Sequence, residues 1–66
     1  MSELNGFKVG DSVFYRRSTG YSEPGEITGF EDSIAIVKTE DFGTVRVHVF
    51  NNRKTSKDWI EKEFSN

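Results

Sequence analysis

Few residues in this chain could do chemistry, because it holds one histidine and no cysteine. His48 lies beside Arg46 on the polar edge of an alternating segment, with no carboxylate predicted to orient its ring. The acidic pairs Glu31-Asp32 and Glu40-Asp41 fall in predicted turns, which favour aspartate for backbone reasons and offer too few oxygens for calcium. We therefore expect no catalytic residue, no metal site and no cofactor, and we predict that the protein is not an enzyme.

The stronger candidate site is a face of basic and aromatic side chains that would bind a partner. Arginines beside exposed aromatic rings suit a protein-binding hot spot, or phosphate contacts combined with base stacking. The alternative is that these residues are ordinary solvated strand faces. The predicted partner-binding residues are Phe14, Arg16, Arg46, His48, Phe50, Arg53 and Lys54.

Charge and composition limit the choice of partner. The chain has 66 residues, a formal net charge of −2, and six Phe, two Tyr and one Trp. The acidic balance removes the bulk electrostatic argument for nucleic-acid binding, although a local basic patch can still form. Carboxylates gather around residues 23–32 and at Glu40-Asp41, so a protein with one basic and one acidic side is expected, which would dock in a defined orientation.

The pattern predicts one domain over residues 7–64, with a flexible lead over residues 1–6 and a tail at residues 65–66. The longest apolar run is Ile34–Val37, so neither a signal peptide nor a membrane-spanning segment is predicted. The absence of cysteine fits a reducing compartment. We therefore expect a cytoplasmic protein with no membrane partner.

The elements that must position these side chains are strands. Val45, Val47 and Val49 alternate with polar residues over Thr44–Phe50, which predicts a strand with one face in the core. The apolar run within Ser33–Lys38 precedes it across a polar turn. The two segments predict a hairpin.

Two further strands are predicted upstream. Ser12–Arg17 is the first, with Val13 and Tyr15 inward, although Phe14 is also a plausible core residue. Ser18–Pro24 is predicted as a loop because it holds serine, glycine and the only proline. Gly25–Glu31 is the second strand, with Ile27 inward and a bulge or bend at Gly29.

The C-terminal segment is ambiguous between helix and strand. Thr55 or Ser56 can cap a helical turn, whereas Ile60, Lys62 and Phe64 alternate as in a strand. We predict one helical turn over Ser56–Trp59, followed by a short closing strand. The alternative is a two-turn helix that packs its apolar residues onto the sheet.

This order of elements resembles an SH3-like barrel, and two motifs add to the resemblance. Val9-Gly10-Asp11-Ser12-Val13 is similar to the turn that leads into the first strand of Tudor-like and KOW-like domains, and Gly25-Glu26-Ile27 is similar to the start of their second strand. The resemblance implies an all-β fold: a five-stranded SH3-like barrel with a short helical turn near the C-terminus. Tudor-like domains hold methylated side chains in aromatic cages, and the candidate cage here is Tyr15, Tyr21 and Phe42.

Families of this shape mostly bind nucleic acid, polymerase or ribosomal proteins, or methylated side chains. The first hypothesis is a non-catalytic protein-interaction module that regulates a larger machine, of a polymerase, ribosome or nuclease type. The alternatives are a nucleic-acid-binding module that uses the basic face, and a structural protein that self-associates along a strand edge. The size and charge balance are typical of small accessory proteins of bacteria and their phages.

Overall fold

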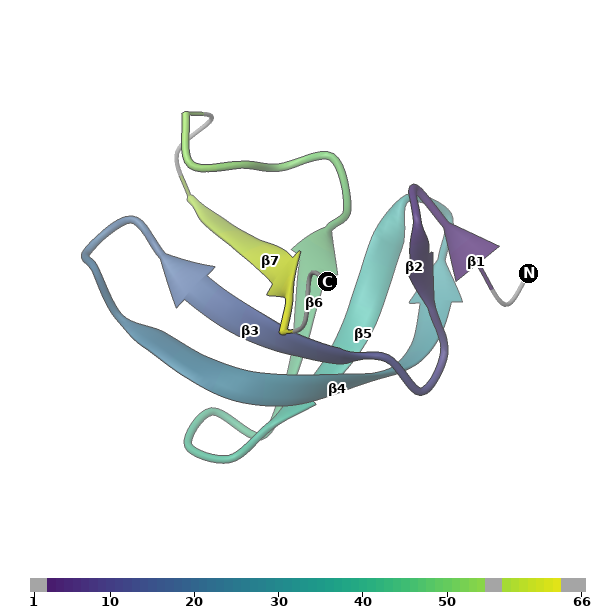
Figure 1. Ribbon diagram of the computed structural model, residues 1–66, viewed down its shortest axis with the longest axis horizontal. Coiled ribbons are helices and arrows are strands. Elements are labelled where there is room, and N and C mark those ends of the chain that lie inside the picture. Colours follow the sequence, from purple (N-terminus) through teal and green to yellow (C-terminus); the bar gives the residue numbers. More distant parts are fainter. Residues whose placement is uncertain (1–2, 55–56, 64–66) are drawn as a thin grey trace.

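The computed structural model describes residues 3–54 and 57–63, and it is all-β (Figure 1). No helix occurs among the described residues. The strands form a two-stranded sheet and a five-stranded sheet, both antiparallel. Their bounds are β1 (Glu3–Leu4), β2 (Phe7–Lys8), β3 (Ser12–Arg17), β4 (Ser22–Glu31), β5 (Ile34–Thr39), β6 (Thr44–His48) and β7 (Asp58–Lys62).

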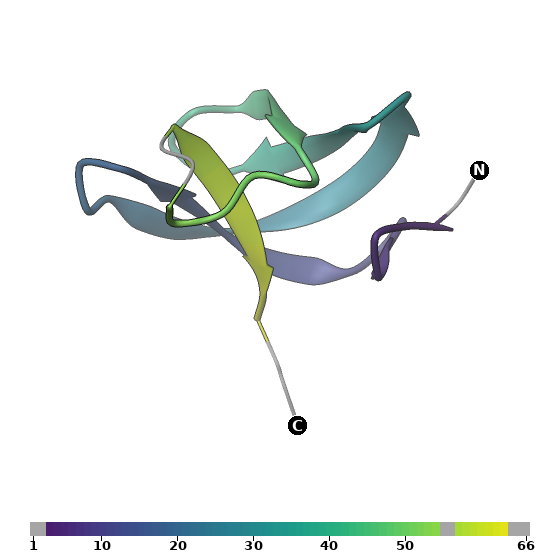
Figure 2. The same ribbon diagram turned by 90° about the horizontal axis from the view of Figure 1, so that it is seen from above.

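The large sheet has the strand order β6-β5-β4-β3-β7. It curls around its own inner face, so the edge strands β6 and β7 approach each other (Figures 1 and 2). No strand pairing joins β6 to β7 among the described residues. The prediction of an all-β fold is therefore confirmed, and five strands do form one sheet, but a second two-stranded sheet was not predicted and barrel closure is not found.

The inner face of the sheet carries the core. Val13, Ile27 and Val37 are fully buried, and Tyr15 is almost so. Alternate residues on each strand share this face, because successive side chains of a strand point to opposite sides. The predicted inward assignment of Val13 and Tyr15 is confirmed, and Phe14 lies on the outer face, half-buried.

The predicted bulge at Gly29 is also confirmed, since the register between β4 and β5 shifts between Ile27 and Gly29. The extra residue turns the following segment, so Phe30 faces Ala35 and packs against the core. The bulge lets a ten-residue strand bend with the sheet.

The second strand begins earlier than predicted. Residues 22–24 belong to β4 and not to the loop, which is a turn over residues 18–21. The nitrogen of Pro24 faces away from β3 and lies beyond Thr39, where β5 ends, so its missing N–H removes no ladder hydrogen bond. Proline is tolerated there for that reason, and its loop-forming tendency misled the prediction.

The predicted helical turn over Ser56–Trp59 is wrong within the described residues, because β7 already includes Trp59. Pairing with β3 along the whole of β7 overrides the local helical spacing. Ser56, like Thr55 and Phe64, lies outside the described residues, as do the tail at 65–66 and the predicted domain end at residue 64.

Glu3–Lys8 forms a small hairpin where a flexible lead was expected for residues 1–6. Asn5 and Gly6 both take positive φ, at 53° and 84°, which makes the tight turn. Leu4 packs against the core, and the Asn5 side-chain amide donates to the carbonyl of Val49 at 2.9 Å. These long-range contacts, which a polar sequence does not reveal, hold the segment on the sheet.

Candidate functional site

Three aromatic rings meet at one end of the sheet, and we call Tyr15, Tyr21 and Phe42 the Phe42 cluster. Phe42 stands edge-to-face against Tyr15, with ring centroids 5.9 Å apart, and against Tyr21 at 5.3 Å. Tyr15 ends the buried row of β3, while Tyr21 and Phe42 come from the β3–β4 and β5–β6 turns. The structure thus brings together all three residues of the candidate cage.

Hydrogen bonds hold the loop that carries Phe42. The hydroxyl of Thr39 donates to the carbonyl of Gly43 at 2.7 Å and accepts the N–H of Phe42 at 3.2 Å. The hydroxyl of Tyr21 donates to Asp41 at 2.7 Å. The ring of Phe42 is therefore positioned by its neighbours, although 44% of the residue is exposed.

A cation and three carboxylates surround the Phe42 cluster. The guanidinium of Arg17 lies over the ring of Phe42, 5.1 Å from its centroid. Glu23 is buried, and one of its oxygens accepts the N–H of Asp41 at 3.0 Å while the other, Oε2, has no described hydrogen-bond partner. Asp58 accepts the hydroxyl proton of Tyr15 at 2.9 Å.

Burial and these carboxylates raise the pKa of the two phenols. Burial, followed by the hydrogen bond to Asp58, raises the pKa of Tyr15 above 10.0. The hydrogen bond to Asp41 is the main cause that raises the pKa of Tyr21. Both hydroxyls donate to carboxylates, and these hydrogen bonds make the phenols harder to ionise.

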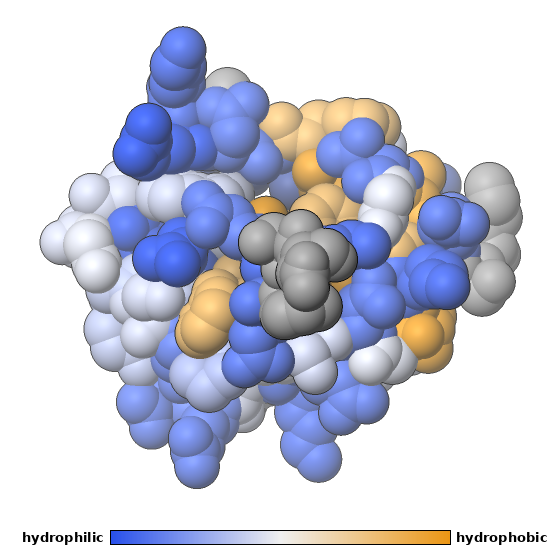
Figure 3. Space-filling view, in the orientation of Figure 1, coloured by the Kyte–Doolittle hydropathy of each residue, from blue (hydrophilic) through white to orange (hydrophobic). Residues whose placement is uncertain are grey.

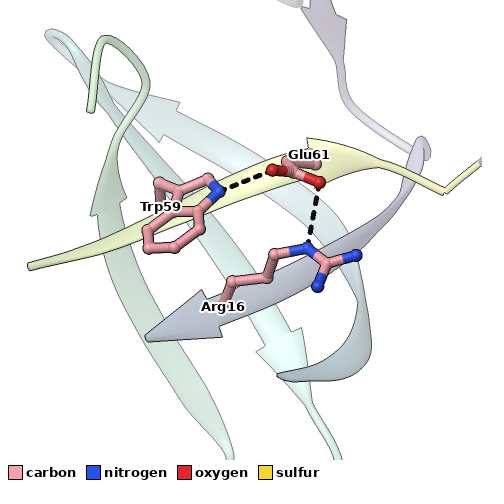
Figure 4. Close-up of polar contacts among 3 residues, drawn as sticks. All are labelled: Arg16, Trp59 and Glu61. Carbon is pink, nitrogen blue, oxygen red and sulfur yellow. Dashed lines mark hydrogen bonds and ion pairs between the residues drawn. The ribbon is translucent and has the colours of Figure 1, made fainter. Parts of the chain in front are cut away.

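A second group of side chains lies on the outer face of β3 and β7. Glu61 accepts hydrogen bonds from the Nε of Arg16 at 2.9 Å and from the indole N–H of Trp59 at 2.8 Å (Figure 4). The Arg16 guanidinium also lies over the ring of Phe14, 5.3 Å from its centroid. Phe14, Arg16, Glu61 and Trp59 thus form one connected row.

A shallow groove of about 590 Å³ lies between β7 and the segment that precedes it, and we call it the Trp59 groove. Asn51 anchors that segment, because its side-chain amide donates to the carbonyl of Asp58 at 3.0 Å. The groove is lined by Asn51, Asn52, Arg53, Lys54, Trp59, Ile60 and Glu61. Two residues of the predicted basic face, Arg53 and Lys54, therefore lie on its rim.

Arg46, His48 and Phe50 are not among the residues that line this groove. Arg46, on β6, forms an ion pair with Glu31 at the end of β4. His48 and Phe50 contact each other, with ring centroids 5.7 Å apart, and Phe50 is 54% exposed. The edge strands β6 and β7 approach each other without pairing, and Arg46 on β6 does not line the groove. The seven predicted residues are thus spread over at least two regions.

Sequence reasoning missed Trp59 and Glu61 as site residues. Trp59 and Glu61 are two residues apart, which puts them on one side of a strand but on different sides of a helix. A strand assignment over Asp58–Lys62 would have placed them together. Nothing in the sequence indicates that Arg17 covers Phe42, since the contact joins the end of β3 to the β5–β6 turn.

We also searched the described residues for metal-binding groups, membrane-spanning helices and large apolar patches. Among residues 3–54 and 57–63, no three His, Asp or Glu side chains lie close enough to hold a metal ion. None of the described residues belongs to a helix with the length and apolar character needed to cross a membrane. Hydrophilic side chains cover most of the face in Figure 3, with apolar surface in separate patches.

Comparison with protein-family models, curated proteins and solved structures finds no match.

Proposed function

We propose that the protein is a non-catalytic protein-interaction module of the SH3-like barrel type, which acts as an accessory factor on a larger nucleic-acid machine. A single curled antiparallel sheet with approaching edges, and the bulge in its longest strand, support the fold assignment. The resemblance of Val9–Val13 to Tudor-like and KOW-like domains supports the class of machine.

The observation that carries the proposal is the positioned and exposed ring of Phe42. Tyrosine and arginine are enriched in binding hot spots, and Phe42 is held between Tyr21 and Arg17. Because the ring is ordered before binding, less side-chain entropy is lost when a partner covers it. Contacts carried on loops above a rigid sheet are a common arrangement for recognition.

A protein partner is favoured over nucleic acid because both strand arginines of the predicted basic face already have carboxylate partners. Arg16 is paired with Glu61, and Arg46 with Glu31. A phosphate would have to compete with these carboxylates, which weakens the electrostatic attraction on which nucleic-acid binding depends.

The test is affinity capture from a lysate of the source organism, with and without nuclease. Phe42→Ala is compared with Val9→Ala, a control that truncates another exposed apolar side chain. We expect nuclease-resistant partners to fall at least about tenfold with Phe42→Ala, which is 1.4 kcal/mol, and to be retained with Val9→Ala. Equal capture by Phe42→Ala and the unaltered protein would contradict the proposal, and capture that nuclease abolishes would indicate nucleic acid.

A second candidate, recognition of a methylated or other cationic side chain, is favoured by the composition of the Phe42 cluster. The three rings predicted to form a cage are in contact, Asp41, Glu23 and Asp58 surround them, and Arg17 already places a cation over Phe42. A trimethyllysine peptide added to Arg17→Ala should shift the ring resonances of Phe42 and Tyr21. Unchanged resonances at millimolar peptide would rule out this reading.

A further inference from the structure

Strand β7 lies at one end of the large sheet, and no strand of the described residues pairs with its outer edge. The N–H of Glu63 donates to the carbonyl of Ser12, and the N–H of Ser18 donates to the carbonyl of Lys57. Residues 57, 59, 61 and 63 therefore turn their backbone groups toward β3, because an antiparallel ladder alternates in this way. The N–H and C=O groups of Asp58, Ile60 and Lys62 consequently face the open edge.

The carbonyl of Asp58 shows that these groups face the open edge, and it already has a hydrogen-bond partner there. The carbonyl of Asp58 accepts the side-chain amide of Asn51, which lies on the open side of β7. Within the described residues, no strand pairs with the outward groups of Ile60 and Lys62, and no backbone hydrogen bond reaches them. The open portion of the edge thus begins at Ile60, which lines the Trp59 groove.

The charges beside this edge favour an anionic occupant. Glu61 is the one carboxylate among the described lining residues, and Arg16 and the indole of Trp59 already engage it. Among the described residues, no ion pair involves Arg53 or Lys54. The rim of the groove therefore presents two cations that a partner's carboxylates can neutralise.

We infer that the Trp59 groove binds an extended acidic peptide segment of a partner protein, which adds as a further strand to β7 through the backbone of Ile60 and Lys62. Strand addition supplies main-chain hydrogen bonds, and alternate side chains of the added segment supply specificity. A volume of about 590 Å³ lies within the usual range of peptide and ligand sites. A nucleic acid has no N–H and C=O ladder with which to pair, so the unpaired edge favours a peptide. The inference rests on the proposed function, because it names a partner class, but it concerns a different surface from the Phe42 cluster.

The probe for the test is a capped hexapeptide that alternates aspartate and valine, titrated into the full-length protein. Trp59 is the only tryptophan of the chain, so its fluorescence reports directly on the groove. Two N-methylated versions of the peptide carry their methyl groups on the odd or on the even residues. In an added strand only every second N–H faces β7, so only one of the two versions loses the N–H groups that pair with it. These probes test backbone pairing without altering the protein.

We expect the acidic hexapeptide to bind and one methylated version to lose at least about tenfold in affinity, while the other version loses less than about threefold. The double variant Arg53→Glu/Lys54→Glu should weaken the same peptide by at least about tenfold. Lys38→Glu is the control, since it makes the same charge reversal at a single position on β5, away from the groove, and should leave affinity within about twofold.

Three results would overturn the inference. Equal losses for the two methylated versions would exclude strand addition, and no fluorescence response to the acidic hexapeptide would exclude the groove as its site. Tighter binding of a ten-nucleotide oligothymidine than of the peptide, with steep salt dependence, would assign the groove to nucleic acid. Each of these leaves the Phe42→Ala capture experiment unaffected, so failure here is distinguishable from failure of the proposed function.

Discussion

The carboxylate of Glu61 accepts the indole N–H of Trp59 at 2.8 Å, two residues back on the same strand (Figure 4). Trp59 is only 7% exposed, although it lies on the outer side of β7 and outside the main core cluster. Its indole N–H finds an acceptor on the same strand, as the N–H of a largely buried indole usually does. Trp59, Glu61 and Arg16 thus form a small hydrogen-bonded group on the outer side of β7 and β3.

Removal of the Glu61 carboxylate should cost more stability than removal of Arg16. Glu61→Ala leaves the indole N–H without its partner and should lower the free energy of unfolding by about 1–3 kcal/mol. Arg16→Ala removes an exposed ion pair and should cost about 0–1 kcal/mol. Urea unfolding followed by Trp59 fluorescence measures both, with Glu63→Ala as the exposed control. Equal losses for the two variants would show that the ion pair, and not the indole bond, is the important contact.

Gly25 should tolerate no side chain, whereas Gly29 should accept one. A Cβ on Gly25 would lie 2.8 Å from Cγ1 of the fully buried Val37, and 3.1 Å from the carbonyl oxygen of Lys38. We expect Gly25→Ala to lower the free energy of unfolding by about 1–3 kcal/mol. At Gly29 the nearest atom is Cδ1 of Ile36 at 3.8 Å, which is ordinary contact. Thermal unfolding of the two variants provides the comparison, and a similar melting temperature for both would contradict this packing.

The hydroxyl of Thr39 should be needed to hold the loop that carries Phe42. Thr39→Val removes a donor to the carbonyl of Gly43 and an acceptor for the N–H of Phe42 in a buried position, and should cost about 1–3 kcal/mol. Amide hydrogen exchange at Phe42 should accelerate. Thr28→Val is the matched control, because the exposed hydroxyl of Thr28 donates to the carbonyl of Ile36 and water can replace it. Unchanged exchange at Phe42 would mean that the ring contacts alone hold the loop.

Stability should decline above about pH 10 because both tyrosines hold their protons more tightly in the folded state. The pKa values of Tyr15 and Tyr21 are raised above 10.0, so the unfolded chain ionises first and their contribution is lost as the pH rises through the folded values. Absorbance titration of tyrosinate should show both midpoints above 10. The chain has only two tyrosines, so Tyr15→Phe/Tyr21→Phe removes the whole signal and should flatten this part of the stability profile. A midpoint at or below 10 would contradict the hydrogen bonds to Asp41 and Asp58.

The sequence predicted correctly that the three cage residues meet, but it did not predict how the residues of the basic face are distributed. The residues Tyr15, Tyr21 and Phe42 were grouped through a resemblance in which turns after the first and third strands converge, and they do lie together. The basic face was assembled from outward positions on different strands, and it is divided between Arg46 with Glu31 and Arg16 with Glu61. Alternation tells which side of a strand a residue faces, but not how far apart two strands lie in the sheet.

By itself, the sequence determined the strands whose side chains alternate, the inward set on β3, and the bulge at Gly29, because periodicity and glycine act within a few neighbouring residues. Only the tertiary structure decided the strand character of Asp58–Lys62, the hairpin of Glu3–Lys8, and the place of Arg17 over Phe42. Each of these depends on partners distant in the chain, whose hydrogen bonds and ring contacts outweigh local preference once the sheet curls.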